Sequence, residues 1–178
     1  RMIRMFCHDY DTDHLYLRFL DRRYRVSRAA GTIEWEDEGV WQHAGFLDAM
    51  TIYDLLCCAK DSASLCGRYS QAENLPGTIH GANPAKGAFD DFAADCDRKP
   101  EALRAACLAL GGREIPMGEL SFEIPLFDFL PVMVQFWSSD EEFPPVFKLM
   151  WDENVLMFLR FETVCYAARF LVMRLQAH

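Results

Sequence analysis

The sequence lacks the features that define several large functional classes. No apolar run approaches the roughly 18 residues needed to span a membrane, so no membrane-spanning helix is expected. Lys and Arg number 18 against 27 Asp and Glu, which gives a net charge of −9. Because neutralising a phosphate backbone requires clustered basic side chains, we expect no nucleic-acid partner. The amino terminus has none of the charged, apolar and small-residue regions of a signal peptide.

The usual spacings of metal and cofactor sites are also absent. The seven cysteines include no Cys-x-x-Cys pair, so no zinc or iron–sulfur site of standard spacing is expected. The five histidines include no i, i+4 pair, and no phosphate loop or dinucleotide-binding glycine motif occurs. The sequence therefore identifies no cofactor. An odd number of cysteines without framework spacing predicts reduced thiols and a cytoplasmic location.

What the sequence has in abundance is apolar and aromatic side chains. Hydrophobic residues make up 51% of the 178 residues, and 14 of them are Phe. This length and composition predict one domain, residues 1–178, with a substantial core. The aromatic surplus leaves open a homodimer that uses aromatic side chains at its interface.

The periodicity of the apolar residues predicts the fold class. Strand-like alternation occurs at 14–20, 23–27, 32–35, 119–124 and in both halves of 131–151. Helical periodicity occurs at 46–60, 85–96, 100–110 and 158–176. Because strands come in hairpins with helices between them, we expect an α+β protein with a mainly antiparallel sheet. About four helices should pack on it, including a C-terminal amphipathic helix.

The helix predicted at 46–60 should contribute one face to the core. Its apolar residues recur at spacings of three and four, which is typical of a helix that packs on a core. These residues are Phe46, Ala49, Met50, Tyr53, Leu56 and Cys57. Since free Cys behaves mostly as a small core residue, Cys57 is expected among apolar neighbours.

The stretch 131–151 contains the main candidate site. Two apolar runs flank an acidic loop that ends in two prolines, a pattern that predicts a buried β-hairpin with a charged tip. Prolines reduce the conformational entropy of such a loop. The candidate ligand-binding residues are Trp137, Asp140, Glu141, Glu142 and Phe143, with His80 of the 62–87 loop as a further candidate.

Three adjacent carboxylates repel one another unless water, a cation or a basic group relieves the repulsion. The loop could bind Mg²⁺ or Ca²⁺ through oxygen ligands, and paired carboxylates could perform acid–base chemistry. It could equally pair with Arg18, Arg23 or Arg25 of the first hairpin, or simply be solvated. The sequence leaves these alternatives open.

Several residues resemble a known family. Trp137, Asp140–Glu142 and Phe143-Pro144, followed by an apolar strand and a C-terminal helix, resemble the Domain of Unknown Function 3786 family of bacteria and archaea. Leu75-Pro76-Gly77 and Leu110-Gly111-Gly112 are similar to weaker motifs of that family. The resemblance implies no activity. Some relatives are joined to iron–sulfur or corrinoid-related modules, which implies a redox or cofactor setting by association only, and this chain contains no such module.

The combined interpretation is a non-catalytic cytoplasmic domain that binds a small molecule, a cofactor or a protein partner. Its binding surface would be the loop 138–145, Trp137 and part of the 62–87 loop. One alternative is a divalent-metal-dependent enzyme that uses Asp140, Glu141 and Glu142. Another alternative is a homodimeric structural or interaction protein.

Overall fold

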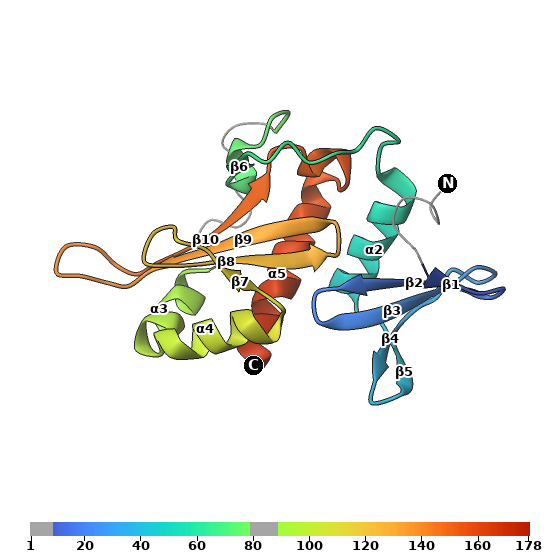
Figure 1. Cartoon of the computed structure of the whole chain (residues 1–178), viewed down its shortest axis with the longest axis horizontal. Coiled ribbons are helices and arrows are strands. Elements are labelled where there is room, and N and C mark those ends of the chain that lie inside the picture. Colours follow the sequence, from blue (N-terminus) through green and yellow to red (C-terminus); the bar gives the residue numbers. More distant parts are fainter. Residues whose placement is uncertain (1–8, 79–88) are drawn as a thin grey trace.

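A computed structural model describes residues 9–78 and 89–178, and its strands form two five-stranded antiparallel sheets (Figure 1). The first sheet runs in sequence order through β1 (Asp9–Tyr10), β2 (His14–Phe19), β3 (Arg22–Ser27), β4 (Ile33–Asp37) and β5 (Val40–His43). The second sheet is ordered β6 (Tyr69–Ser70), β10 (Val146–Asp152), β9 (Leu130–Trp137), β8 (Leu120–Phe127) and β7 (Arg113–Glu114). The predicted α+β class and antiparallel hairpins are confirmed, with the strands divided between two sheets.

The described residues contain four α-helices, as predicted. They are α2 (Phe46–Cys58), α3 (Asp90–Arg98), α4 (Pro100–Ala109) and the C-terminal α5 (Phe161–Ala177), with short 3-10 turns η1 (Ala72–Asn74) and η2 (Val155–Met157). Figure 1 shows α3 and α4 on the side of the second sheet, α2 next to the first sheet, and α5 between these two groups. Among the described residues, no helix is long and apolar enough to cross a membrane.

The predicted hairpin at 131–151 is formed by β9 and β10. Trp137 pairs with Val146 next to the connecting loop, and Val132 pairs with Trp151 five residues further along each strand. Alternate residues face the core along both strands, as the period of two requires. The first hairpin is also formed, with His14 opposite Ser27. The edge strand β5 and the two-residue strands β1, β6 and β7 were not predicted.

A single hydrophobic core contains residues of both sheets. Phe19 of β2 stacks on Phe127 of β8 at 4.8 Å and on Phe170 of α5 at 5.1 Å between ring centroids. The backbone N–H of Leu20 donates to the carbonyl of Leu126 at 2.8 Å, which joins the first hairpin to the second sheet. These contacts fix the two sheets relative to each other because all five side chains are buried.

Two polar contacts connect distant segments to this core. Asp152, fully buried at the end of β10, accepts hydrogen bonds from the backbone N–H groups of Cys66 and Gly67 at 3.1 and 2.8 Å. Asp21, in the turn between β2 and β3, accepts two hydrogen bonds from the guanidinium of Arg174 in α5, at 2.6 and 3.1 Å. At both places a carboxylate with two hydrogen-bond donors holds distant parts of the chain together.

The apolar stripe of α2 faces outward, which corrects the sequence-based assignment of this helix. Phe46 is 65% exposed, Met50 and Tyr53 are each 38% exposed, and Cys57 is also exposed. Of the six residues assigned to the stripe, Leu56 is buried and Ala49 is half-buried against the core, as predicted.

The physical reason is that the opposite face of α2 carries polar side chains with partners. Asp48, only 2% exposed, accepts a hydrogen bond from Oη of Tyr24 at 2.9 Å. Asp54 accepts one from the backbone N–H of Arg160 at 2.6 Å. Polar groups that have hydrogen-bond partners can be buried at little cost. The side of α2 that carries Asp48 and Asp54 therefore faces inward, and Ile52 and Leu55 on that side reach the core.

Candidate functional site

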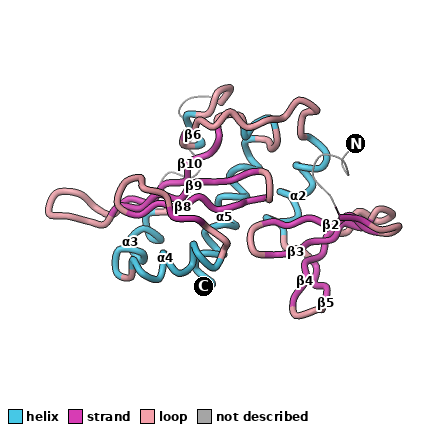
Figure 2. Tube along the Cα trace, in the orientation of Figure 1, coloured by secondary structure: helices cyan, strands magenta, loops and turns pink. Residues whose placement is uncertain are grey.

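The loop between β9 and β10, residues 138–145 and hereafter called the tip, projects beyond both sheets. Figures 1 and 2 show it at the left of the view, extending past the ends of its own strands. Within the tip, Oδ1 of Asp140 accepts hydrogen bonds from the backbone N–H groups of Glu142 and Phe143, each at 2.8 Å. The N–H of Asp140 donates in return to the carbonyl of Phe143 at 3.0 Å. Asp140 thus shapes the turn, as Asp side chains commonly do.

Two serines fix the base of the tip to other elements. The backbone N–H of Ser138 donates to Glu119 at 2.8 Å and its hydroxyl donates to the same carboxylate at 2.5 Å. Ser139 repeats this arrangement with Asp97 at the end of α3, at 2.8 and 2.7 Å. In both contacts the carboxylate accepts one hydrogen bond with each of its two oxygens. We call these two contacts the serine clamps. They join the tip to segments 19 and 42 residues away in the sequence.

The contact with Ser139 lowers the pKa of the Asp97 carboxyl group. The hydroxyl and the backbone N–H of Ser139 both hold the pKa of Asp97 below its usual value, because they stabilise the charged carboxylate. The clamp is therefore fully formed at neutral pH. Protonation removes it only below the ordinary pKa of an aspartate.

The acidic side chains of the tip face solvent. Asp140, Glu141 and Glu142 are exposed, and within the described residues none of them forms an ion pair. Pairing with the first hairpin, one of the sequence-based alternatives, does not occur. Arg23 pairs with Asp9 and Glu36, Arg25 pairs with Glu34, and Arg18 donates to the carbonyl of Leu20 (all within the first sheet or its turns).

Phe143 is the apolar residue that the tip presents. Its side chain is 65% exposed and lies between the acidic residues and Pro144. Aromatic residues are enriched at protein interfaces relative to the rest of the protein surface. The tip therefore combines a negative charge with one apolar anchor.

Trp137 has a supporting position at the base of the tip. Nζ of Lys148 lies 5.2 Å from the centroid of its ring on one side. Gly118 lies on the ring as well, since a Cβ added there would be 3.1 Å from Cζ2 of Trp137. Gly118 also has a φ of 67°, a conformation that side-chain-bearing residues rarely adopt. Trp137 is half-buried by these contacts.

Among the residues that the structure describes, the tip does not gather the ligands of a metal site. In residues 9–78 and 89–178 no group of three or more His, Cys, Asp and Glu side chains is placed to hold a metal ion. Oδ1 of Asp140 is already used by two backbone N–H groups. His80 lies outside the described residues.

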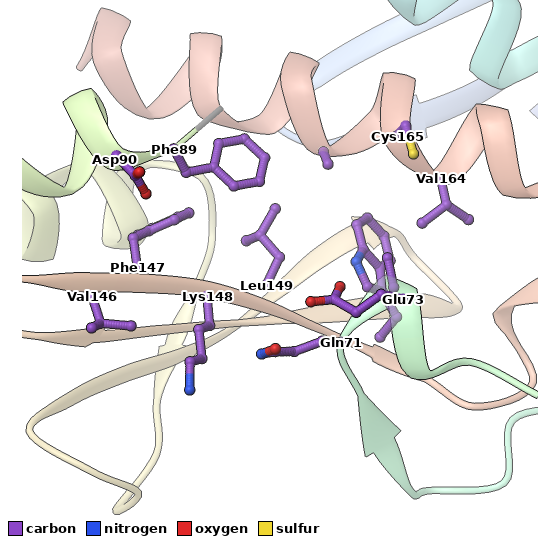
Figure 3. A pocket seen from close by; sticks show the side chains of 13 residues that line it. Gln71, Glu73, Phe89, Asp90, Val146, Phe147, Lys148, Leu149, Val164 and Cys165 are labelled. Atoms are coloured by element: carbon purple, nitrogen blue, oxygen red, sulfur yellow. The ribbon is translucent and has the colours of Figure 1, made fainter. Parts of the chain in front are cut away.

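A pocket of about 210 Å³ lies behind the base of the tip, between β10, α5, η1 and the start of α3. Its walls include Phe89, Phe147 and Leu149, and Glu73 and Cys165 supply polar atoms. Figure 3 shows the carboxylate of Glu73 directed into this space from one side and Sγ of Cys165 directed toward it from α5. The acidic residues of the tip do not line the pocket, whereas part of the 62–87 loop does.

Three partly or fully buried thiols are held in their protonated form. Burial raises the pKa of Cys165, which lines the pocket, and the nearby Glu162 adds to this effect. Burial likewise raises the pKa of Cys96 to about 11 and that of Cys107 to about 12. A raised pKa leaves the thiol protonated at neutral pH, whereas the thiolate is the nucleophile. None of these three cysteines has the properties of a catalytic residue.

The fold and the site define an α+β protein with two antiparallel sheets and a clamped acidic hairpin tip. The model of the family described as "Domain of unknown function (DUF3786)" matches residues 2–174. The chain therefore belongs to the DUF3786 family. No curated protein and no solved structure matches it.

The structure brings five of the six predicted site residues into one region and gives them different roles. Asp140 organises the turn, Trp137 supports its base, and Glu141, Glu142 and Phe143 are presented to solvent. The sequence analysis missed the serine clamps, because no local pattern connects a serine to a carboxylate 42 residues earlier.

Proposed function

We propose that the protein is a non-catalytic binding module that docks a protein partner through its tip. The observation that supports this most is the combination of the serine clamps with the exposed Phe143. A loop that is already held in one shape loses little conformational entropy on binding, so more of the contact energy is available for affinity.

The chemistry of the tip indicates the kind of surface it fits. Asp140, Glu141 and Glu142 give it three negative charges that no ion pair within the described residues neutralises. Phe143 is the aromatic anchor at their edge. The complementary surface is an apolar hollow with a rim of Lys and Arg, because electrostatic complementarity guides association and a buried aromatic side chain supplies affinity.

The proposal is tested by immobilising the protein and measuring, by quantitative mass spectrometry, what it retains from a lysate of its source cells. We expect a discrete protein to be retained by the wild type and lost with Phe143→Ala. Val40→Ala is the matched control, since Val40 is 58% exposed at the turn of the β4–β5 hairpin. Retention of the same proteins by the wild type and by Phe143→Ala would contradict the proposal.

A second candidate function is favoured by the pocket behind the tip. A space of about 210 Å³ with aromatic and aliphatic walls and a few polar atoms has the character of a small-molecule site, although it is smaller than most drug-sized pockets. Native mass spectrometry of protein purified from its source cells tests this function. A bound mass should disappear with Gln71→Trp, which obstructs the pocket, and should remain with Gln176→Trp, which lies outside it. An unliganded mass for the wild type would count against it.

A metal-dependent enzyme receives less support from the same geometry. Asp140, Glu141 and Glu142 are adjacent in sequence, but one oxygen of Asp140 already accepts two hydrogen bonds within the turn. Among the described residues, no three ligand side chains converge on one point. A thermal melt with Mg²⁺, Mn²⁺ and Ca²⁺ distinguishes a metal-dependent enzyme from a docking module, because a bound cation raises the melting temperature. A cation at about one hundred times its dissociation constant would add roughly 2.7 kcal/mol.

A further inference from the structure

The outward stripe of α2 has a neighbour on α5. Glu162, Tyr166, Arg169 and Met173 recur at spacings of four, three and four, which places them on one side of α5. Glu162 and Arg169 are exposed, and so is 54% of Met173. The ring of Phe46 meets that of Tyr166 edge-on at 5.3 Å, so the two stripes adjoin.

The two helices run antiparallel across this surface. Phe46 at the start of α2 contacts Tyr166, whereas Asp54 near its end bonds to the backbone N–H of Arg160, just before α5 begins. We call the resulting surface the helical face. Its members are Phe46, Met50, Tyr53 and Cys57 of α2 with Glu162, Tyr166, Arg169 and Met173 of α5.

The helical face is unusual for a solvent-facing helix pair, because its centre is apolar. A surface helix normally turns its apolar stripe inward and its polar residues outward. Here α2 buries Ile52 and Leu55 together with Asp48 and Asp54. Its outer side nevertheless exposes Phe46, Met50 and Tyr53. Apolar surface arranged in this way is typical of an interaction site.

The charges of the helical face indicate which partner covers it. Glu162 and Arg169 have opposite charges, and in the described part of the chain neither forms an ion pair. They are seven residues apart, so they lie about 10 Å from each other along the helix, on either side of Tyr166. This pattern is complementary to its own copy rotated by 180°.

We propose that the helical face is the interface of a two-fold symmetric homodimer. With the axis near Tyr166, α5 crosses its counterpart in the opposite direction. Glu162 of one protomer then meets Arg169 of the other, and the reverse pair forms across the axis, as isologous contacts require. The apolar residues of α2 are covered at the same time. Figure 1 shows the tip at the far left of the molecule and α2 to the right of α5, well away from the tip, so the dimer leaves the tip accessible.

Charge reversal provides the sharpest test, with the mass in solution measured by sedimentation at several concentrations. Glu162→Arg and Arg169→Glu should each weaken dimerisation by at least about a hundredfold, since each creates two like-charge contacts across the axis. The double variant Glu162→Arg/Arg169→Glu restores both pairs with reversed polarity. We expect its dissociation constant to return to within about tenfold of the wild-type value.

A separate variant tests the apolar part of the interface. Met50→Glu should give a monomer, while Val40→Glu, at an even more exposed apolar position outside the helical face, should leave the dimer intact. Unfolding curves of all variants show whether each one is folded. A wild-type protein that is monomeric at every concentration would overturn the proposal, as would a dimer that Met50→Glu and the single charge reversals leave unchanged. Because the tip is not involved, neither result bears on partner docking.

Discussion

The carboxylate of Asp97 accepts both the backbone N–H and the hydroxyl of Ser139, at 2.8 and 2.7 Å, and so fastens the tip of one hairpin to the end of α3. Ser138 and Glu119 form the equivalent contact on the other side. A solvent-exposed loop with this many internal and external hydrogen bonds is held in one conformation, which is the physical basis of the docking proposal.

The first prediction concerns the clamp itself. Asp97→Ala should increase the hydrogen-exchange rate of the Ser139 amide with little change in the unfolding midpoint, because the contact lies outside the core. It should also weaken partner retention. Asp95→Ala is the control on the same helix, since Asp95 pairs only with Arg98 among the described residues. Unchanged exchange at Ser139 in Asp97→Ala would show that the clamp does not hold the tip.

The pH dependence of this clamp follows from the pKa of Asp97, which Ser139 lowers. A lowered pKa means that the contact is fully present above the ordinary value of 3.8 and is lost as pH falls through the lowered value. Protection of the Ser139 amide should therefore persist to a pH below 3.8. Loss of protection at a pH well above 3.8 would contradict this assignment.

Phe143→Ala is predicted to leave the stability unchanged. The side chain is 65% exposed, so its removal should alter the free energy of unfolding by no more than about 0.5 kcal/mol. Urea unfolding measures this value. The combination of unchanged stability and lost partner retention separates a docking role from a structural role, whereas a large destabilisation would assign Phe143 to the fold.

Asp152→Ala is predicted to destabilise the protein strongly. The change removes a fully buried carboxylate and leaves the N–H groups of Cys66, Gly67 and Asn154 without their acceptor, and should cost about 3 kcal/mol. Asp128→Ala, in the exposed β8–β9 turn, is the control and should cost less than about 0.5 kcal/mol. Equal urea midpoints for the two variants would refute this account of how the segment before β6 is held.

The ionisation of Asp152 supports the same view. Burial by itself would raise the pKa of Asp152, but the N–H donors of Asn154, Cys66 and Gly67 more than offset burial and lower it. The contribution of Asp152 to stability is therefore present above pH 3.8 and lost as the pH falls through the lowered pKa.

The pair formed by Asp21 and Arg174 should show coupling in a double-mutant cycle. Both side chains are less than one-fifth exposed and they share two hydrogen bonds. Arg174→Ala should cost about 2 kcal/mol, a value between those of exposed and fully buried ion pairs. Asp21→Ala/Arg174→Ala should cost less than the sum of the single changes. Strict additivity would mean that the pair contributes nothing.

The sequence predicted the parts of the fold that depend on local pattern. The alternation in 131–151 and its closing prolines indicated a hairpin with a charged tip, and the structure has that hairpin. The stripe of α5 indicated a packed C-terminal helix, and residues such as Val164 and Leu171 are fully buried.

The remaining features depend on contacts between distant residues. Periodicity suggested that Phe46, Met50 and Tyr53 of α2 pack on the core, yet they are exposed because Asp48 and Asp54 have partners in β3 and before α5. A carboxylate with a distant donor cannot be told from a solvated one by sequence alone. The serine clamps escaped prediction for the same reason.

The most direct test of the central claim is photo-cross-linking from the tip inside intact source cells. A benzoylphenylalanine in place of Phe143 should give one discrete cross-linked protein, and the same group in place of Val40 should not. Adding Asp97→Ala should reduce the yield at position 143. If both positions give the same products, or if position 143 gives none, the tip is not a docking element.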